Sequence, residues 1–167
     1  MHNELLAVVD EQDQAIDRRP RPEIHASGLR HRAVHILVFN DRGRLFLQKR
    51  SMKKDLNKGL WDSSAAGHVD AGESYDSCAP RELWEELGIK AELSFLFKLE
   101  ATAELGMEFI QVYKCLHNGP FVLAVDEVEE GVWLTTADIS ERVCHDDPRL
   151  TLTFKIIWQT YSQHADR

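Results

Sequence analysis

Residues 67–89 have the sequence GHVDAGESYDSCAPRELWEELGI, and this stretch decides the fold that we expect. Glu82, Glu85 and Glu86 are spaced at i, i+3 and i+4. Because an α-helix turns by about 100° per residue, this spacing places the three carboxylates on one face of a helix. The opposite side carries the apolar residues Leu83, Trp84 and Leu87. One side of the helix can therefore pack on a sheet while the other side carries chemistry.

The carboxylate cluster has two interpretations. A run of charge on a helix is usually a solvated surface, and such surfaces normally mix lysines with the acids because like charges at i and i+4 cost roughly 0.2–0.5 kcal/mol per pair. Here only Arg81 offsets the acids. Since carboxylates are the oxygen ligands that Mg²⁺ prefers, the cluster favours a divalent metal site.

The residues before the helix indicate a tight loop. Gly67 and Gly72 allow sharp turns and a close approach of the backbone to a ligand, and Asp70 and Glu73 add two acids. A junction between a loop and a helix also presents free N–H groups. Those groups could hold an anion.

The spacing of this stretch resembles the signature of the Nudix hydrolases, the MutT-like family, at every defined position. That signature is Gly, five residues, Glu, seven residues, Arg-Glu, an apolar residue, any residue, Glu-Glu, any residue, Gly and an apolar residue. The resemblance implies a Nudix-type α/β/α sandwich around a central mixed β-sheet. It also implies an ion pair that braces the loop, between Glu73 and Arg81, and a site for Mg²⁺ or Mn²⁺ formed by Glu82, Glu85, Glu86 and the carbonyl of Gly67.

Pro80 departs from the family pattern, in which small helix formers are common at this position. A proline deep inside a helix lacks an N–H donor and clashes with the preceding turn, whereas a proline in the first turn is tolerated. We therefore predict a late or irregular helix start near Ser77, rather than a start at Tyr75 behind a Ser74 cap. Regular geometry is expected from Arg81 onward.

Length and charge limit the classes of partner. A chain of 167 residues is long enough for one domain with a substantial core, and we expect residues 1–167 to form a single domain. Lys and Arg number 20 against 28 Asp and Glu, which gives a net charge of −8. This balance argues against nucleic acid or an anionic membrane as the main partner. We expect a small diphosphate substrate, whose repulsion a bound metal must mask, and the sequence leaves a homodimer open.

Three cysteines, Cys78, Cys115 and Cys144, are widely separated and form no CxxC pair. We interpret them as reduced thiols of a cytoplasmic protein. Residues 1–10 are neither basic enough at their start nor apolar for long enough to form a signal peptide. No long apolar run predicts a membrane span.

The pattern along the chain predicts many strands, one central helix and a closing helix. Asn40-Asp41-Arg42-Gly43 lies between two apolar runs and indicates a hairpin, whereas residues 18–23, with two prolines, predict a break in regular structure. Strands are also predicted at 5–9, near 15–16, and at 33–39, 45–49, 61–66, 93–103, 108–116 and 128–134, with further helices at 136–143 and 151–164. This order is typical of an α/β sandwich with a mixed sheet.

A general base must lie within reach of the attacking water. Glu82 is the candidate within the signature, and the candidates from a distant loop are Glu127, Glu129 and Glu130. Glu108 could be an additional metal ligand. For each single acid outside the signature, an exposed surface residue is the favoured interpretation, and the sequence does not choose among them. The catalytic set that we predict is Glu82, Arg81, Glu73 and Glu130.

Cationic side chains before the signature could meet the phosphates of a substrate, because such groups pair well with them. The candidates are Lys49, Arg50, Lys53 and Lys54. A solvated loop is an equally good interpretation of the lysines. We predict substrate contacts from Arg50 first, together with Lys53 and His68.

The segments RHRAVHILVFNDRG, LFLQKRS and GLWDSSAAGH resemble a branch of the superfamily related to type 1 isopentenyl-diphosphate isomerase. The resemblance runs from roughly Leu5 to Asp138, and it raises metal-dependent double-bond isomerisation as a rival function. The isomerase has a cysteine before its Gly-His pair, where this chain has Ala66, which cannot donate or accept a proton. The isomerase signature is also degenerate, whereas the signature here is intact. Both differences favour hydrolysis.

Histidines in these segments bind metal in the isomerase. His31 and His68 match that pattern better than His35 does, although the cysteine of the isomerase is missing. The alternative interpretation is a polar lining residue or a structural histidine.

A diphosphate resists water because its negative oxygens repel nucleophiles. Divalent metal neutralises that charge, orients the phosphates and lowers the pKa of a bound water. We therefore expect a metal-dependent Nudix hydrolase that cleaves a diphosphate linkage in a nucleoside diphosphate derivative or a related metabolite. A nucleotide-sensing module without turnover is a third interpretation, which the intact signature disfavours.

Overall fold

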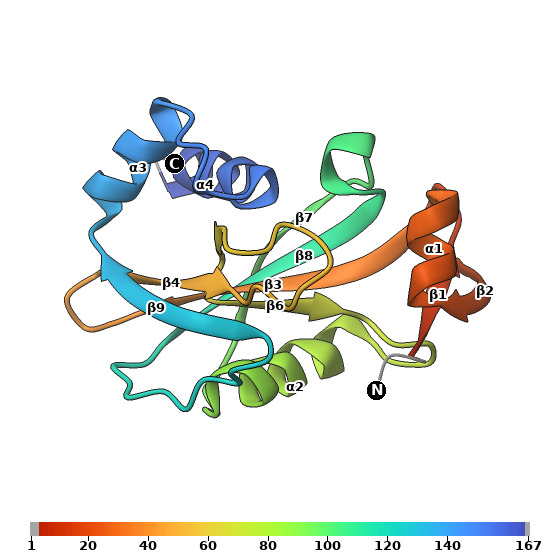
Figure 1. The fold of residues 1–167 in the computed structure, drawn as a ribbon, viewed down its shortest axis with the longest axis horizontal. Coiled ribbons are helices and arrows are strands. Elements are labelled where there is room, and N and C mark those ends of the chain that lie inside the picture. The colour runs from red at the N-terminus through yellow and green to blue at the C-terminus, as the bar shows by residue number, and fades with distance from the viewer. Residues whose placement is uncertain (1–3, 166–167) are drawn as a thin grey trace.

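A seven-stranded mixed β-sheet lies at the centre of the structure, a computed structural model that describes residues 4–165 (Figure 1). The strand order is β5-β4-β3-β8-β7, with β6 paired to β3 and β9 paired to β4. β3 and β8 run parallel, and the other pairs run antiparallel. The strands are β3 (His31–Phe39), β4 (Leu45–Arg50), β5 (Trp61–Asp62), β6 (Ala65–His68), β7 (Ser94–Leu99), β8 (Glu108–Leu116) and β9 (Val128–Leu134).

Helices cover both faces of this sheet (Figure 1). α2 (Tyr75–Leu87) covers one face, and α3 (Thr136–Cys144) and α4 (Leu152–Ala165) cover the other. Because successive side chains of a strand point to opposite faces, Leu37 of β3 packs in the core beneath α3 and α4, and Ile36 packs beneath α2. The predicted α/β sandwich with a central mixed sheet is confirmed.

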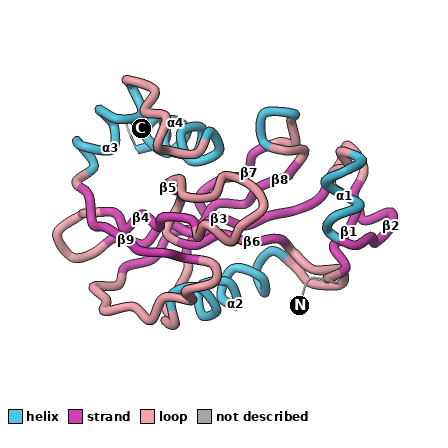
Figure 2. The backbone as a smooth tube through the Cα atoms, in the orientation of Figure 1, coloured by secondary structure: helices cyan, strands magenta, loops and turns pink. Residues whose placement is uncertain are grey.

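A small N-terminal unit lies at one end of the main sheet (Figure 2). It consists of the hairpin β1 (Leu5–Val9) and β2 (Ala15–Pro20), followed by α1 (Arg21–Ser27). The predicted break at residues 18–23 is wrong, because β2 continues to Pro20 and α1 starts at the next residue. Pro22 lies in the first turn of α1, where a helix tolerates proline because the missing N–H would have no helical acceptor.

Residues 61–66 belong to two strands rather than to the one that we predicted. β5 pairs with β4, and β6 pairs with β3. Between them, the buried hydroxyl of Ser64 accepts the N–H of Val38 at 2.8 Å and donates to the carbonyl of Phe46. The chain can therefore change strand partner here because a side chain supplies the hydrogen bonds that a ladder would otherwise make.

Other boundaries follow the sequence closely. The turn predicted at residues 40–43 is confirmed, since the N–H of Gly43 donates to the carbonyl of Asn40 at 3.1 Å and Phe39 pairs with Leu45. β7 ends at Leu99 rather than near residue 103, where the short 3₁₀ helix η1 (Ala103–Leu105) begins. The three cysteines are free thiols.

None of the helices within residues 4–165 combines the length and the apolar character that crossing a membrane requires.

Candidate active site

α2 begins at Tyr75, directly behind Ser74, whose hydroxyl accepts the N–H of Ser77 at 3.1 Å. The predicted late start is therefore wrong, and Pro80 lies inside a continuous helix. The cap satisfies a backbone donor of the first turn, which allows the helix to begin ahead of the proline. At the other end Gly88 adopts a left-handed conformation with φ of 68°, so the predicted helix end is confirmed.

The three signature acids of α2 differ in exposure. The side chain of Glu82 is 12% exposed and that of Glu85 is 53% exposed, while Glu86 is buried. Glu82 and Glu86 point toward the sheet, and Glu85 lies at the rim. The three acids therefore do not form one exposed face. Two of them turn toward the sheet and only Glu85 is largely in solvent.

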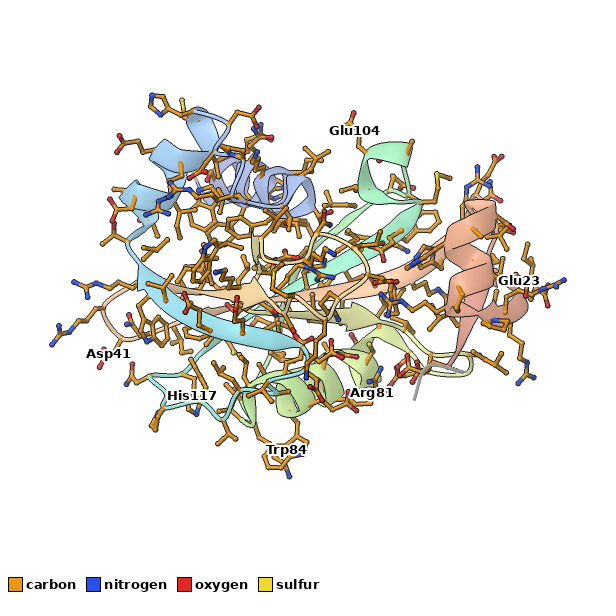
Figure 3. All side chains as sticks on the ribbon, viewed as in Figure 1. Glu23, Asp41, Arg81, Trp84, Glu104 and His117 are labelled. Carbon is orange, nitrogen blue, oxygen red and sulfur yellow. The ribbon has the colours of Figure 1, made fainter. Side chains whose placement is uncertain are left out.

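Trp84 does not pack on the sheet as predicted. It is 55% exposed, it points from α2 away from the rest of the molecule in Figure 3, and the ammonium of Lys90 lies 5.3 Å from its ring centroid. Ala79, Leu83 and Leu87 are buried and fill the side of α2 that faces the sheet. Trp84 lies beside this stripe because it is one residue, about 100°, beyond Leu83.

Gly67 of β6 lies directly beneath Glu82, so close that a β-carbon at this position would overlap the carboxyl group of Glu82. Oε1 of Glu86 accepts the backbone N–H of Ala66 at 2.9 Å and Nε2 of Gln48 at 3.0 Å. Strand β6 therefore forms the floor under two acids of the helix. We call this set the glutamate centre: Gly67, Glu82, Glu85 and Glu86.

Arg81 joins the loop to the helix, as the labelled side chain in Figure 3 indicates. Its Nε and Nη2 atoms donate to the two carboxylate oxygens of Glu73 at 2.7 and 2.8 Å, so the expected ion pair is present. Its Nη1 atom donates to Glu82 at 2.9 Å and to Glu85 at 3.0 Å. A bidentate pair of this kind fixes orientation as well as distance, so the acids are held in place.

Burial and the neighbouring carboxylates raise the pKa of Glu82, and burial raises the pKa of Glu86. Both shifts mean that the charged carboxylates lack sufficient compensation from the protein. A divalent cation would supply it, and a cluster of hard oxygen ligands suits Mg²⁺ or Mn²⁺. Because Gly67 has no side chain, the carboxyl group of Glu82 can lie directly against the backbone of β6, beside the carbonyl oxygens of that strand.

Arg50 lies at the end of β4, where its Nη1 atom is 3.6 Å from a carboxylate oxygen of Asp62 and its Nε atom donates to the carbonyl of Leu56 at 3.1 Å. These contacts tie it to the loop formed by residues 51–60. Its guanidinium is mostly buried, so it is fixed in position.

The two neighbouring lysines of this loop differ. The side chain of Lys53 is 72% exposed and pairs with Asp126 at 2.7 Å. Lys54 is mostly buried and pairs with Glu127, and its charge lowers the pKa of Glu86. We predicted a substrate contact from Lys53. In the structure it is the ammonium of Lys54 that lies close to the glutamate centre.

The acids proposed as a distant general base lie in three different places. Glu129 pairs with Lys49 at 3.3 Å. Glu130 lines a cleft of about 390 Å³ with Arg142 and Arg149, on the face of the sheet covered by α3. Glu127 is the one whose charge raises the pKa of Glu86. The catalytic role assigned to Glu130 stays a prediction.

A second group of potential metal ligands lies on the other side of β6. One ring nitrogen from each of His25, His31 and His68 lies within 4.8 Å of the other two. The ring centroids are 5.2 to 5.4 Å apart. Oε2 of Glu108 lies 2.7 Å from Nε2 of His68 and 3.3 Å from Nε2 of His31. We call these four residues the histidine centre. Imidazole nitrogens with a carboxylate suit Zn²⁺, Mn²⁺ or Fe²⁺.

The imidazoles of the histidine centre stabilise the charged form of Glu108. Burial alone would raise the pKa of Glu108, but the imidazoles of His31 and His68 hold it well below its ordinary range. Burial and the two other imidazoles lower the pKa of His25 to about 4. His35 is not part of this group, since its Nδ1 atom lies 2.8 Å from the hydroxyl of Ser63 in the core.

Sequence reasoning missed His25 of the histidine centre and Gln48, which contacts the glutamate centre. His25 was missed because residues 18–23 were interpreted as irregular, although a proline after Arg21 is a usual sign of a helix start. Gln48 looks like any polar residue of a strand, and only the pairing of β4 shows that it faces Glu86. No local pattern marks Gln48.

The chain is similar to several known proteins. The family model described as NUDIX domain matches residues 29–154. An uncharacterized Nudix hydrolase of Yersinia pestis is 33% identical over 98% of this chain and 90% of its own length. An isopentenyl-diphosphate Delta-isomerase of Serratia proteamaculans is 34% identical over 93% of this chain and 89% of its own. A crystal structure from Deinococcus radiodurans superposes with a TM-score of 0.76 at 26% identity, over 85% of this chain and 90% of that one.

Proposed function

The chain belongs to the Nudix hydrolase family, and from this premise we propose that it hydrolyses a diphosphate linkage of a small metabolite at the glutamate centre. The observation that carries the proposal is the mostly buried carboxylate of Glu82 above Gly67, with the buried carboxylate of Glu86 beside it in the same centre. Buried charge is costly unless an opposite charge compensates it. A divalent cation bound here would offset that cost and attract a diphosphate.

The carbonyl of Gly67 and the carboxylates of Glu82, Glu85 and Glu86 would hold Mg²⁺ or Mn²⁺. When bound, such a metal supplies charge neutralisation for the phosphate oxygens and a more acidic water. Arg81 holds two of the acids and the loop in one arrangement before the substrate arrives. Little reorganisation is then needed in the transition state.

The substrate that we propose is a nucleoside diphosphate derivative or a related metabolite. Arg50 and Lys54 would meet its phosphates, and Lys53 and His68 remain proposed contacts. A carboxylate accepts the proton of the attacking water as the new P–O bond forms and the bridging P–O bond breaks. Glu82 is the proposed acceptor within the centre, and the loop acids are the alternatives.

Isomerisation of a prenyl diphosphate is the second candidate function. The histidine centre favours it, because the isomerase branch that this chain resembles binds metal through histidines, and a relative at 34% identity is named an isomerase. Ala66 opposes it, because a methyl group stands where that branch has a cysteine. A ligand-sensing role without turnover is a third candidate, which the complete signature opposes.

The decisive experiment measures phosphate and monophosphate release from nucleotides, nucleotide sugars, coenzyme diphosphates and isopentenyl diphosphate. We expect release from at least one compound with Mg²⁺ or Mn²⁺ and none with excess EDTA. Rearranged isopentenyl diphosphate without phosphate release would establish the isomerase instead. Tight binding of a nucleotide with no product would establish the sensor.

A further inference from the structure

Asp13 is a buried carboxylate that ties the N-terminal hairpin to three other elements. It lies in the turn between β1 and β2 with φ of 61°, a conformation that aspartate tolerates. It accepts Nε of Arg32 at 2.7 Å, the hydroxyl of Tyr75 at 2.6 Å, and the ammonium of Lys98. These partners belong to β3, α2 and β7. Although burial alone would raise it, the hydrogen bonds from Arg32, Lys98 and Tyr75 hold the pKa of Asp13 below its ordinary value.

The same hairpin holds the loop that leads into α2. The carbonyl of Leu5 accepts the N–H of Ala71 at 2.8 Å, and Leu6 forms an antiparallel bridge with Asp70. In Figure 1 this loop runs beside β1. Residues 4–28 precede the segment matched by the NUDIX family model. A part of the chain outside the matched domain therefore supports both the signature loop and the first residue of the signature helix.

α2 needs such support because Pro80 removes one of its backbone hydrogen bonds. In an α-helix residue 80 would donate its N–H to the carbonyl of Asp76, and proline has no N–H. Two phenol hydroxyls link this first turn to residues outside the helix. The hydroxyl of Tyr75 donates to Asp13, and the hydroxyl of Tyr113 donates to Oδ1 of Asp76 at 2.7 Å. Tertiary hydrogen bonds thus act at the turn where a helical one is missing.

The placement of this turn affects the glutamate centre directly. Arg81 follows Pro80 in the helix, and its guanidinium contacts Glu73 on the loop and Glu82 on the helix. A tilt of the first turn would move Arg81 relative to the loop and shift the carboxylate of Glu82 above β6. A displacement of about 1 Å in a reacting geometry can cost on the order of a hundredfold in rate.

We propose that Asp13, acting through Tyr75, is a positioning residue of the glutamate centre, and that the N-terminal hairpin replaces from outside the support that Pro80 removes from the helix. The inference deepens the proposed function and rests on the metal site that this function assigns to the glutamate centre. Asp13 touches neither substrate nor metal. Its effect on turnover passes through the orientation of the first turn of α2.

Tyr75→Phe is the main test, because it removes only the hydroxyl that binds Asp13. The ring keeps its contacts with the charges of Arg32 and Lys98, whose centres lie 5.4 and 5.3 Å from its centroid. We expect kcat to fall roughly tenfold while KM changes less than about twofold, because a hydrogen bond to a charged group is lost away from the substrate. The matched control is Tyr161→Phe in α4, which removes a phenol hydroxyl far from α2 and should leave kcat unchanged.

Pro80→Ala separates positioning from general stability. Alanine at position 80 restores the N–H that can bond the carbonyl of Asp76, so the first turn no longer depends on the hairpin. In the Pro80→Ala background we expect Tyr75→Phe to cost less than about twofold in kcat. An equal loss in both backgrounds would show that Tyr75 only anchors the hairpin, and it would overturn the inference.

Mn²⁺ affinity, followed by the EPR signal of the free ion, provides a readout that needs no turnover. Tyr75→Phe and Asp13→Asn should weaken Mn²⁺ binding roughly threefold to tenfold, less than the 10- to 100-fold typical of groups that contact metal ligands directly. If the wild-type protein hydrolyses nothing yet this shift is seen, the proposed function fails and the inference stands. If the wild-type protein is active and neither kcat nor Mn²⁺ affinity changes in Tyr75→Phe, the inference fails alone. If the wild-type protein neither hydrolyses any compound nor binds Mn²⁺, the proposed function and the inference both fail.

Discussion

Gly67 and His68 are neighbours in β6, yet they belong to different centres. Gly67 faces Glu82 of α2, and His68 faces Glu108 on the other side of the sheet. The acids of the glutamate centre come from little more than one turn of a helix, whereas the histidine centre combines residues of α1, β3, β6 and β8. Burial raises the pKa of Glu82 in the first centre, whereas hydrogen bonds from His31 and His68 lower the pKa of Glu108 in the second. The comparison teaches that buried carboxylates differ in what stabilises their charged form. At the glutamate centre a bound cation is still needed, whereas at the histidine centre the protein itself supplies the partners.

The largest effect should come from removing an acid of the glutamate centre that does not support the fold. Glu85 is the exposed one, so Glu85→Gln should lower kcat at least about a hundredfold while the thermal unfolding temperature stays unchanged. The matched control is Glu104→Gln, an exposed glutamate on η1 (Figure 3). If phosphate release by Glu85→Gln matches that of the control, Glu85 is not a metal ligand.

A second variant tests the floor under the helix. Gly67→Ala adds a methyl group that overlaps the carboxyl of Glu82 and so displaces that carboxyl from its place above β6. We expect kcat to fall on the order of a hundredfold, because the reacting geometry shifts by about 1 Å. Mn²⁺ titration should show weaker binding. Normal kcat in this variant would mean that Glu82 can leave its place above Gly67 without consequence.

The two centres should respond to pH with opposite signs in the metal-free protein. Burial raises the pKa of Glu82 above its unfolded value, so its contribution to stability is present at acidic pH and is lost as pH rises from about 4.5 toward the raised pKa. The pKa of His25 falls from 6.5 to about 4, so its contribution is present above 6.5 and is lost as pH falls toward 4.

Thermal unfolding in EDTA between pH 4 and 9 measures both losses of stability: the alkaline limb of the curve, where stability falls as pH rises, and the acid limb, where it falls as pH decreases. Glu82→Gln should flatten the alkaline limb, and His25→Gln should flatten the acid limb. Mg²⁺ should also flatten the alkaline limb of the wild-type protein, because metal binds the deprotonated acids. An alkaline limb that survives Glu82→Gln would contradict the charge imbalance assigned to the glutamate centre.

The smallest effect concerns two adjacent lysines. Lys54→Met should raise KM severalfold, because its ammonium lies beside the glutamate centre and can meet a phosphate. Lys53→Met should change KM less than about twofold, because its ion pair with Asp126 is in solvent. Steady-state kinetics on the same substrate compares them directly, and the reverse order would favour our sequence-based choice of Lys53.

The sequence by itself determined the fold class and the arrangement of the glutamate centre. Fixed offsets along one helix place Glu82, Glu85 and Glu86 together whatever surrounds them, because the helical repeat is a local property of the backbone. The ion pair between Glu73 and Arg81, which the resemblance to the Nudix signature implied, is present. Alternating apolar runs with turn residues between them were sufficient to predict the mixed sheet.

Only the tertiary structure decided what depends on contacts between distant segments. The helix starts at Tyr75 despite Pro80 because a cap, Asp13 and a phenol of β8 hold its first turn. His25 enters the histidine centre because α1 forms where two prolines indicated a break. Burial of two signature acids, and the different environments of two neighbouring lysines, depend on which strand lies opposite. Hydrogen bonds and burial of this kind join residues far apart in the chain, and no local pattern of side chains encodes them.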